Sequence, residues 1–268
     1  MVHKMWKTNK LTDKSELLAF LETDRLYAAY AVGDLEPGMF EQSTWAGAEA
    51  EGRLQALALY FRGLEPPALF LMGDGHGLRA ILEDVLRPER VYLICRAEHL
   101  VTARDFYAWE EMTPMWRMVL RRARFRPAEG ECLRLEPTHA RRLTELYALG
   151  TGNAFSPAQM ERGVFYGILS DGNLVAAAGT HLVSPTYGVA AVGNVFTHPD
   201  YRGQGYGTVT TSAVVAELLQ LGIRDVILNV NQDNATAIRI YERLGFERYC
   251  PFLEGPASAS KSKKRDAD

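Results

Sequence analysis

Hydrophobic and polar positions along the chain form two successive series of strand and helix patterns, one in each half. In the first half, the patterns predict a helix, two strands joined by a short turn, a third strand, a glycine turn, a second helix and a further strand. These segments are residues 15–30, 44–48, 54–61, 68–72, 73–77, 78–86 and 91–95.

The second half repeats this order. A helix, a short helix, a hairpin, a strand, a long central helix, a strand and a last helix are predicted at residues 138–149, 158–163, 164–182, 189–197, 208–221, 223–230 and 234–244. We therefore expect a degenerate internal repeat of about half the chain. The alternative is that the first half is an unrelated α/β domain.

The most informative stretch is residues 192–215, which predict a strand, a glycine loop and a helix. Gly203, Gly205 and Gly207 allow the loop to turn with several N–H groups pointing the same way, and the helix start adds unpaired donors. A phosphate or pyrophosphate would bind well there. The simpler alternative is a turn that only joins the strand to the helix. The loop lacks the lysine of a P-loop and the glycine spacing of a dinucleotide fingerprint.

Two segments carry a family resemblance. Arg202-Gly203-Gln204-Gly205-Tyr206-Gly207 resembles the R-x-x-G-x-G acyl-CoA loop of the GNAT superfamily of N-acetyltransferases. Residues 234–246, NATAIRIYERLGF, resemble the second signature of that superfamily, N-x-x-A-x-x-x-Y-E-x-x-G-F. The resemblance extends from about residue 133 to residue 252. It implies an α/β protein with a mixed sheet, the GNAT acyl-CoA N-acyltransferase fold, and two GNAT-like domains in tandem.

The resemblance also implies a site. Acetyl-CoA, as acyl donor, would lie between the two central parallel strands, with its pantetheine arm along the first strand, its pyrophosphate on the glycine loop, and Arg202 shaping that loop. Tyr241 would be the catalytic general acid that protonates the leaving thiolate. The residues implied in binding acetyl-CoA are Val195, Phe196, Thr197, Arg202, Gly203, Gln204, Gly205, Tyr206, Gly207, Thr208 and Asn234.

The sequence does not identify the general base. Some members of the superfamily use a glutamate on the strand before the asparagine motif, and the matching residue here is Asn229, which cannot act as a base. His181 and His198 are candidate replacements, because an imidazole titrates near neutral pH. A structural role is the alternative for each, and a substrate amine that is already neutral would need no base.

The acceptor is not identified by the sequence. By the resemblance, Phe155, Phe165 and Tyr166 are candidates to contact it, and ordinary core aromatics are the alternative. The first hypothesis is an acyl-CoA-dependent N-acetyltransferase that acts on a primary amine of a small molecule or peptide. The second is a non-catalytic acyl-CoA-binding or sensor module with an N-terminal interaction domain. Acyl chain length, and a monomer or homodimer, remain open.

The first half lacks both motifs. Asp74 and His76 occupy the positions of Gln204 and Tyr206, and an acidic residue in that turn would repel a pyrophosphate. We therefore expect residues 1–126 to form a degenerate GNAT-like domain without bound cofactor. Residues 127–255 are expected to form the acetyltransferase domain, and residues 256–268, rich in serine, lysine and aspartate, a disordered tail. The basic run at 117–126 predicts a solvated helix face, with an anion site as the alternative.

Composition mainly excludes classes of partner. A net charge of -3 over 268 residues offers no electrostatic reason to expect nucleic acid or an anionic membrane as partner. No apolar run is long enough for a membrane span, and the first residues are too polar for a signal peptide. The three cysteines lack metal-ligand spacing. Free thiols, no metal and a cytoplasmic location are therefore expected.

Overall fold

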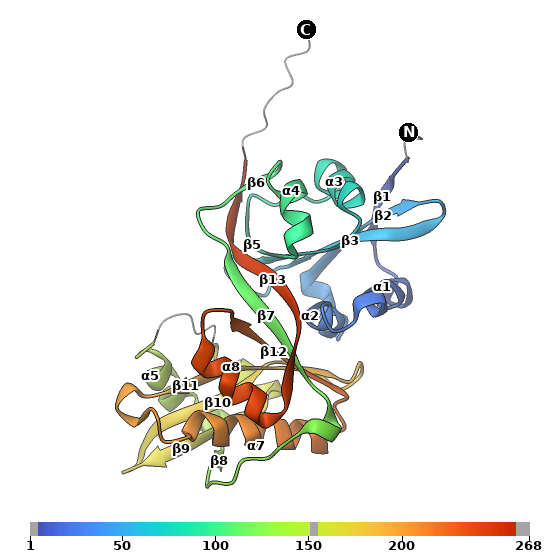
Figure 1. Cartoon of the computed structure of the whole chain (residues 1–268). Coiled ribbons are helices and arrows are strands. Elements are labelled where there is room, and N and C mark those ends of the chain that lie inside the picture. Colours follow the sequence, from blue (N-terminus) through green and yellow to red (C-terminus); the bar gives the residue numbers. More distant parts are fainter. Residues whose placement is uncertain (1–4, 151–154, 261–268) are drawn as a thin grey trace. The chain divides into compact units, whose positions relative to one another are not determined.

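The computed structural model describes residues 5–150 and 155–260, and the chain divides into two compact units (Figure 1). Trp116–Cys250 form the C-terminal unit. The described residues before 116 and after 250 form the N-terminal unit. Two strands, β7 (Thr113–Leu120) and β13 (Phe246–Ala259), run through these division points and contribute to both units.

The N-terminal unit is a mixed sheet with helices. Its strands are β1 (Lys7–Leu11), β2 (Ser43–Ala50), β3 (Arg53–Phe61), β4 (Ala68–Gly73), β5 (Arg90–Cys95) and β6 (Tyr107–Ala108). Its helices are α1 (Lys14–Leu21), α2 (Ala29–Gly33), α3 (Gly75–Asp84) and α4 (Leu100–Ala103). The sheet order is β1-β2-β3-β4-β5-β13, with β6 also paired to β13. The pair β4/β5 is parallel, whereas β1/β2, β2/β3, β3/β4 and β5/β13 are antiparallel.

The C-terminal unit repeats this plan. Its strands are β8 (Leu133–Arg134), β9 (Tyr166–Ser170), β10 (Asn173–Ser184), β11 (Val189–Thr197) and β12 (Asp225–Asn231). Its helices are α5 (Ala140–Tyr147), α6 (Gln159–Arg162), α7 (Tyr206–Gln220) and α8 (Ala235–Leu244). The order is β8-β9-β10-β11-β12-β7-β13, and the pair β11/β12 is parallel. The predicted repeat of element order is therefore present in the structure.

The second part of β13, from residue 251 onward, belongs to the sheet of the first half. In β13, Leu253 lies opposite Cys95 and Ser258 lies opposite Arg90, so the end of the chain is inserted between β5 and β6. Residues 256–259 are thus strand, and not part of a disordered tail; the rest of that predicted tail, 261–268, lies outside the described residues. The units also divide at residues 115/116 and 250/251, away from the boundary expected near residue 126.

The basic run adopts a different structure from the one predicted. Residues 113–120 are strand β7, followed by a 3-10 turn at Arg122–Arg124. Arg117 is only 2% exposed, which excludes a solvated helix face for this residue. The helix predicted over 15–30 is also interrupted: α1 ends at Leu21, and a 3-10 turn at Glu22–Asp24 precedes α2.

Two separate cores cover the faces of the C-terminal sheet. Ala177 packs with residues of α5, whereas its neighbour Ala178 packs with α7 and α8, because successive strand residues point to opposite faces. Residues of α7 and α8 share one core, which brings Val214 and Tyr241 into the same cluster. The first turn of α7 lies beside the end of β11, because a Cβ at Gly207 would be 3.6 Å from Thr197 Oγ1 and 3.9 Å from Val195 Cγ1.

Candidate active site

The parallel strands β11 and β12 separate before they end. Their pairing runs from Val189 opposite Asp225 to Val192 opposite Leu228, while β11 continues to Thr197 and β12 to Asn231. Asn194 has a φ of 51°, and the register between β10 and β11 shifts around it. This bulge turns β11 away from regular pairing and leaves backbone polar groups at the carboxyl ends of both strands. The predicted strand segment Val195, Phe196 and Thr197 lies here.

The glycine loop opens at this same end of the sheet. Gly203 and Gly205 have φ values of 80° and 82°, and no atom lies within 4 Å of the position that a Cβ would take at either residue. Among the described residues, no backbone acceptor is recorded for the N–H groups of residues 203–207. Thr208 differs, because its N–H donates to the Gly205 carbonyl at 2.9 Å. The loop thus presents a row of free donors at the start of a 15-residue helix, where the helix dipole favours an anion.

Arg202 ties this loop to the end of β11. Its Nε donates to the Thr197 carbonyl at 3.3 Å, and its guanidinium lies 5.8 Å from the ring centroid of Phe196. The side chain is directed back to the strand, so its contribution is to hold the loop in place.

Asn234 caps α8. Its Oδ1 accepts the N–H of Ala237 at 3.0 Å, which satisfies one of the unpaired donors at the helix start. The residue is exposed, so its Nδ2 can donate to another group. One side chain can therefore serve both the helix and a ligand.

Tyr241 lies on the buried face of α8. It is 8% exposed, and its ring packs edge-on against Phe246 with centroids 6.0 Å apart. Burial raises the pKa of Tyr241 to about 12, so the phenol keeps its proton at neutral pH. No hydrogen bond from its hydroxyl to another described residue is recorded. The structure thus places a protonated phenol in the core that contains the diverging strands.

The two candidate bases have different environments. The ring of His181 stands over Gly193 of β11, where a Cβ would lie 2.3 Å from the ring. The side chain of His181 is exposed, yet its pKa is lowered, because the protein atoms packed around the ring keep water from the charged form. A hydrogen bond with Asn194 partly offsets this lowering of the pKa. His198 instead accepts the N–H of Asp200 at 3.2 Å through Nδ1, and so caps the turn before the glycine loop. His181 is the better placed of the two, because it lies beside the bulge.

Asn229 follows Leu228, the last residue of β12 that pairs with β11. Its Oδ1 is buried and has no hydrogen-bond partner among the described residues. An unsatisfied buried acceptor is costly, so a ligand that donates to it would be favoured.

The three aromatic candidates for acceptor contact are mostly structural. Phe165 is fully buried in the core beneath α5, and Phe155 packs on it with centroids 5.8 Å apart. Tyr166 interacts with Glu217 and lies 5.9 Å from the guanidinium of Arg134. Sequence reasoning missed Tyr147, whose hydroxyl bonds to the bulge at Asn194, because the last residue of an amphipathic helix carries no local sign of such a contact.

Among the described residues, no group of three or more His, Cys, Asp and Glu side chains could hold a metal ion. No described helix combines the length and the apolar character needed to cross a membrane.

Comparisons with known proteins agree with this geometry. The model of the acetyltransferase (GNAT) family matches residues 128–246. The [ribosomal protein bS18]-alanine N-acetyltransferase of Escherichia coli K12 is 32% identical over 111 residues, which are 39% of this chain and 73% of that protein. The mycothiol acetyltransferase of Geodermatophilus obscurus is 43% identical over 65 residues, 23% of this chain. The match spans only 21% of that relative's length.

A solved structure extends the similarity to both units. The tandem GNAT protein from the clavulanic acid biosynthesis pathway has a TM-score of 0.59 and 15% identity, covering 95% of this chain and 98% of that one. This likeness concerns the fold, and it confirms the expected arrangement of two GNAT-like domains in tandem with mixed sheets. The family model, the match to most of the Escherichia coli relative and the shared fold lead to one conclusion: the chain belongs to the GNAT acetyltransferase family.

Proposed function

We propose that the C-terminal unit transfers an acetyl group from acetyl-CoA to a primary amine of a small molecule or peptide. The observation that carries this proposal is the row of free N–H groups at residues 203–207, placed where β11 and β12 separate. The GNAT family uses acyl-CoA donors, and the local chemistry fits one. The loop offers donors and open space to a pyrophosphate, and the buried Oδ1 of Asn229 offers an acceptor to an amide N–H.

Each residue of the site has a distinct task in this proposal. The N–H groups of residues 203–207 bind the pyrophosphate, Arg202 holds the loop, and the backbone of residues 195–197 pairs with the pantetheine arm. Asn234 Nδ2 donates to that arm while its Oδ1 caps α8. The Thr208 hydroxyl, in place of its engaged N–H, is available to the phosphates.

Acetyl-CoA supplies an activated thioester. The neutral acceptor nitrogen forms a bond to the acetyl carbon, the carbon–sulfur bond breaks, and Tyr241 donates its proton to the departing sulfur. Attack leaves the nitrogen with an extra proton, which passes to His181 or to water, and a proton from solvent then restores the Tyr241 phenol. The lowered pKa of His181 and the raised pKa of Tyr241 support these roles, since they favour an unprotonated base and a protonated acid at neutral pH.

One observation favours a second function. Asn229 stands where some relatives have a glutamate, and an amide cannot accept the proton of the amine. A non-catalytic acyl-CoA-binding or sensor module is therefore the second candidate. It predicts binding of acetyl-CoA without turnover by any amine.

Calorimetry with acetyl-CoA tests the site. Gly205→Glu places a carboxylate at the loop, and Gly222→Glu is its matched control, because Gly222 has a φ of 81°, equally open surroundings and a position at the other end of α7. Both variants bear the same backbone strain, but only the first introduces charge at the proposed pyrophosphate site. We expect one equivalent bound by the wild type and by Gly222→Glu, and none by Gly205→Glu. Equal binding by both variants would contradict the proposal.

Turnover is measured in the same preparations by release of free thiol with a panel of primary amines. Thiol release by the wild type supports the transferase. Binding without release from any amine supports the sensor module.

A further inference from the structure

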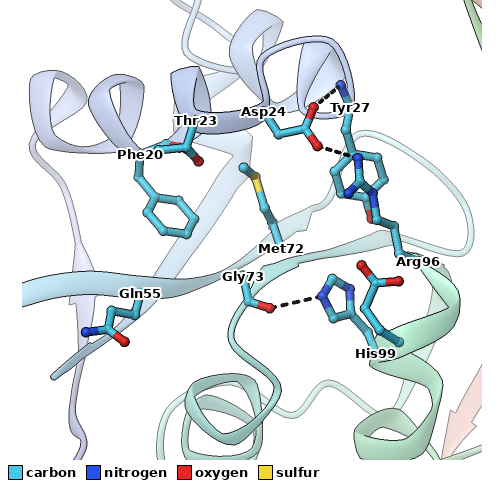
Figure 2. A pocket seen from close by; sticks show the side chains of 10 residues that line it. Phe20, Thr23, Asp24, Tyr27, Gln55, Met72, Gly73, Arg96 and His99 are labelled. Atoms are coloured by element: carbon cyan, nitrogen blue, oxygen red, sulfur yellow. Dashed lines mark hydrogen bonds and ion pairs between the residues drawn. The ribbon is translucent and has the colours of Figure 1, made fainter. Parts of the chain in front are cut away.

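The N-terminal unit contains a cavity of about 300 Å³ at the carboxyl ends of its own parallel strands. Pairing of β4 with β5 ends at Phe70 opposite Ile94, and the cavity begins beyond this point. Figure 2 shows its wall, to which the end of β4 contributes Met72 and Gly73 and the segment after β5 contributes Arg96 and His99. Helix α1 and the turn after it close the other side. Crevices at the carboxyl ends of parallel strands are common ligand sites in open sheets.

This cavity lacks the means to bind an acyl-CoA pyrophosphate. Asp74 alone connects β4 to α3, whereas the glycine loop supplies the corresponding connection in the C-terminal unit. The Asp74 carboxylate accepts the N–H groups of His76 and Gly77 at 2.8 and 3.1 Å. Those donors are thus occupied by a negative charge from the chain itself, so a ligand of a different class must be sought.

His99 provides the recognition element. The residue is 4% exposed, and its Nε2 lies 3.0 Å from the Gly73 carbonyl oxygen. A carbonyl only accepts, so Nε2 carries the hydrogen and Nδ1 of the neutral ring presents a lone pair. Nδ1 is buried and has no partner among the described residues. Burial lowers the pKa of His99, which keeps the ring neutral, and a donor from a ligand would relieve the cost of the unpaired acceptor.

The charges around the cavity favour a cation. Arg96 forms an ion pair with Asp24 and lies 4.4 Å from the ring centroid of Tyr27, so its charge is already balanced. Glu98 also lines the cavity, is exposed, and forms no recorded ion pair within the described part of the chain. The lining therefore has an excess negative charge beside an unpaired acceptor. The Phe20 ring and the Met72 thioether provide apolar surface in the same cavity (Figure 2).

We propose that this cavity binds a small primary amine as a second ligand site, separate from the acetyl-transfer site of the C-terminal unit. The ammonium group donates to His99 Nδ1 and is attracted by the Glu98 carboxylate. The hydrocarbon part of the amine packs against Phe20 and Met72. The proposal does not depend on the proposed transferase activity, because it concerns residues of the other unit.

Three probes of nearly equal size test it: 2-phenylethylamine, 2-phenylethanol and phenylacetate. They share an aromatic ring and differ in a cationic, neutral or anionic polar end. Titrations of the full-length protein are followed by long-range nitrogen–proton NMR of the histidine rings, which reports a hydrogen bond accepted by Nδ1. We expect the amine to shift the His99 Nδ1 resonance, and to bind at least about tenfold more tightly than the alcohol, as a charged hydrogen bond would produce. Phenylacetate should not bind.

Two variants and one control assign the contacts. Glu98→Gln, at an exposed position, should reduce the preference for the amine over the alcohol about threefold to fivefold, the range of an exposed ion pair. His99→Phe should abolish binding of the amine, and His76→Gln, an exposed histidine of the same unit, should bind as the wild type does. If His99→Phe does not fold, the proposal is judged by the amine preference of Glu98→Gln and by the shift of the His99 Nδ1 resonance in the wild type. Absence of amine binding, equal binding of phenylacetate, or amine binding unaffected by the variants would each overturn the proposal.

Discussion

The Tyr147 hydroxyl donates a 2.6 Å hydrogen bond to the carbonyl oxygen of Asn194. Asn194 is the residue with positive φ at which β11 departs from regular strand geometry, and Tyr147 is the last residue of α5. The bond thus connects a helix on one face of the C-terminal sheet to the bulge that precedes residues 195–197. It fixes the direction of residues 195–197, the end of β11 that is proposed to pair with the pantetheine arm of acetyl-CoA.

Tyr147→Phe tests this relationship. The phenyl ring keeps the packing against Phe155, but the buried Asn194 carbonyl loses its donor, so we expect a loss of about 1–3 kcal/mol in the free energy of unfolding. A less rigid bulge should also raise the Kd for acetyl-CoA. Chemical denaturation and calorimetry measure the two effects. An unchanged Kd in a destabilised protein would show that the bond serves the fold alone.

Asn234 substitutions separate helix capping from ligand binding. Asp is as good an N-cap as Asn, so Asn234→Asp should unfold at nearly the wild-type temperature, whereas Asn234→Ala should lose about 1 kcal/mol of stability. Asp has no Nδ2 group to donate a hydrogen bond, and it adds negative charge near the pantetheine arm of acetyl-CoA. We therefore expect Asn234→Asp to weaken acetyl-CoA binding although it is stable. Wild-type binding by this variant would exclude Asn234 as a contact of the acyl donor.

Tyr241→Phe removes the proposed acid while the ring keeps its contact with Phe246. General acid catalysis typically contributes about 10²–10⁴-fold, so kcat should fall by about that factor with little change in the Kd for acetyl-CoA. Because burial raises the pKa of Tyr241 to about 12, its ionisation should not limit the wild-type rate below pH 9. Steady-state kinetics and calorimetry provide both values. A kcat within twofold of wild type would remove Tyr241 from the mechanism.

His181→Ala tests the proposed base through the pH profile. The pKa of His181 is lowered from its ordinary value, so the ring is neutral at pH 7 and becomes protonated only as the pH falls further. If His181 is the base, wild-type kcat/KM should decline on the acid side as the ring gains its proton, and the variant should lose that limb. His198→Ala is the control, because that ring caps a turn. An acid limb unaltered by His181→Ala would exclude the role.

Asp34 predicts a pH dependence of stability. It follows α2, and burial raises its pKa to about 8, so the folded state holds a proton that the unfolded state releases above pH 4. Folding must therefore take up a proton, and the free energy of unfolding falls as the pH rises from 4 to 8. Asp34→Asn should have little effect on the unfolding temperature at pH 4 and stabilise the protein by about 1 kcal/mol at pH 8, since partial solvent contact reduces the full linkage effect. Asp171→Asn, in an exposed turn, is the control; the same trend in both would contradict the assignment.

Local patterns predicted much of the fold and of the site. The hairpin turn at Asp171-Gly172 has the positive φ values that its residues suggest, and Gly222 and Gly245 end helices in left-handed geometry. The limits of β11 agree with the predicted strand at 189–197. These features depend on neighbouring residues, because the glycine conformation and the alternation of apolar residues act over a few positions.

The features that were missed depend on residues far apart in the sequence. Residues 256–259 look like part of a polar tail, yet they form a strand, because β5 pairs with residues 256–258 and β6 pairs with Ala259. Arg117 is buried although it lies in a basic run, because β7 is incorporated into a sheet. Backbone pairing compensates for unfavourable local composition, and local periodicity cannot report it.

By itself, the sequence determined the glycine loop, the asparagine–tyrosine helix motif and the order of elements in both halves, since each is set by local backbone and helix preferences. Only the tertiary structure decided that β13 completes the N-terminal sheet, that Tyr147 holds the bulge at Asn194, and that His99 presents an unpaired nitrogen to a cavity. The physical reason is that strand pairing, burial and the pairing of buried polar atoms depend on which distant segments the fold brings together.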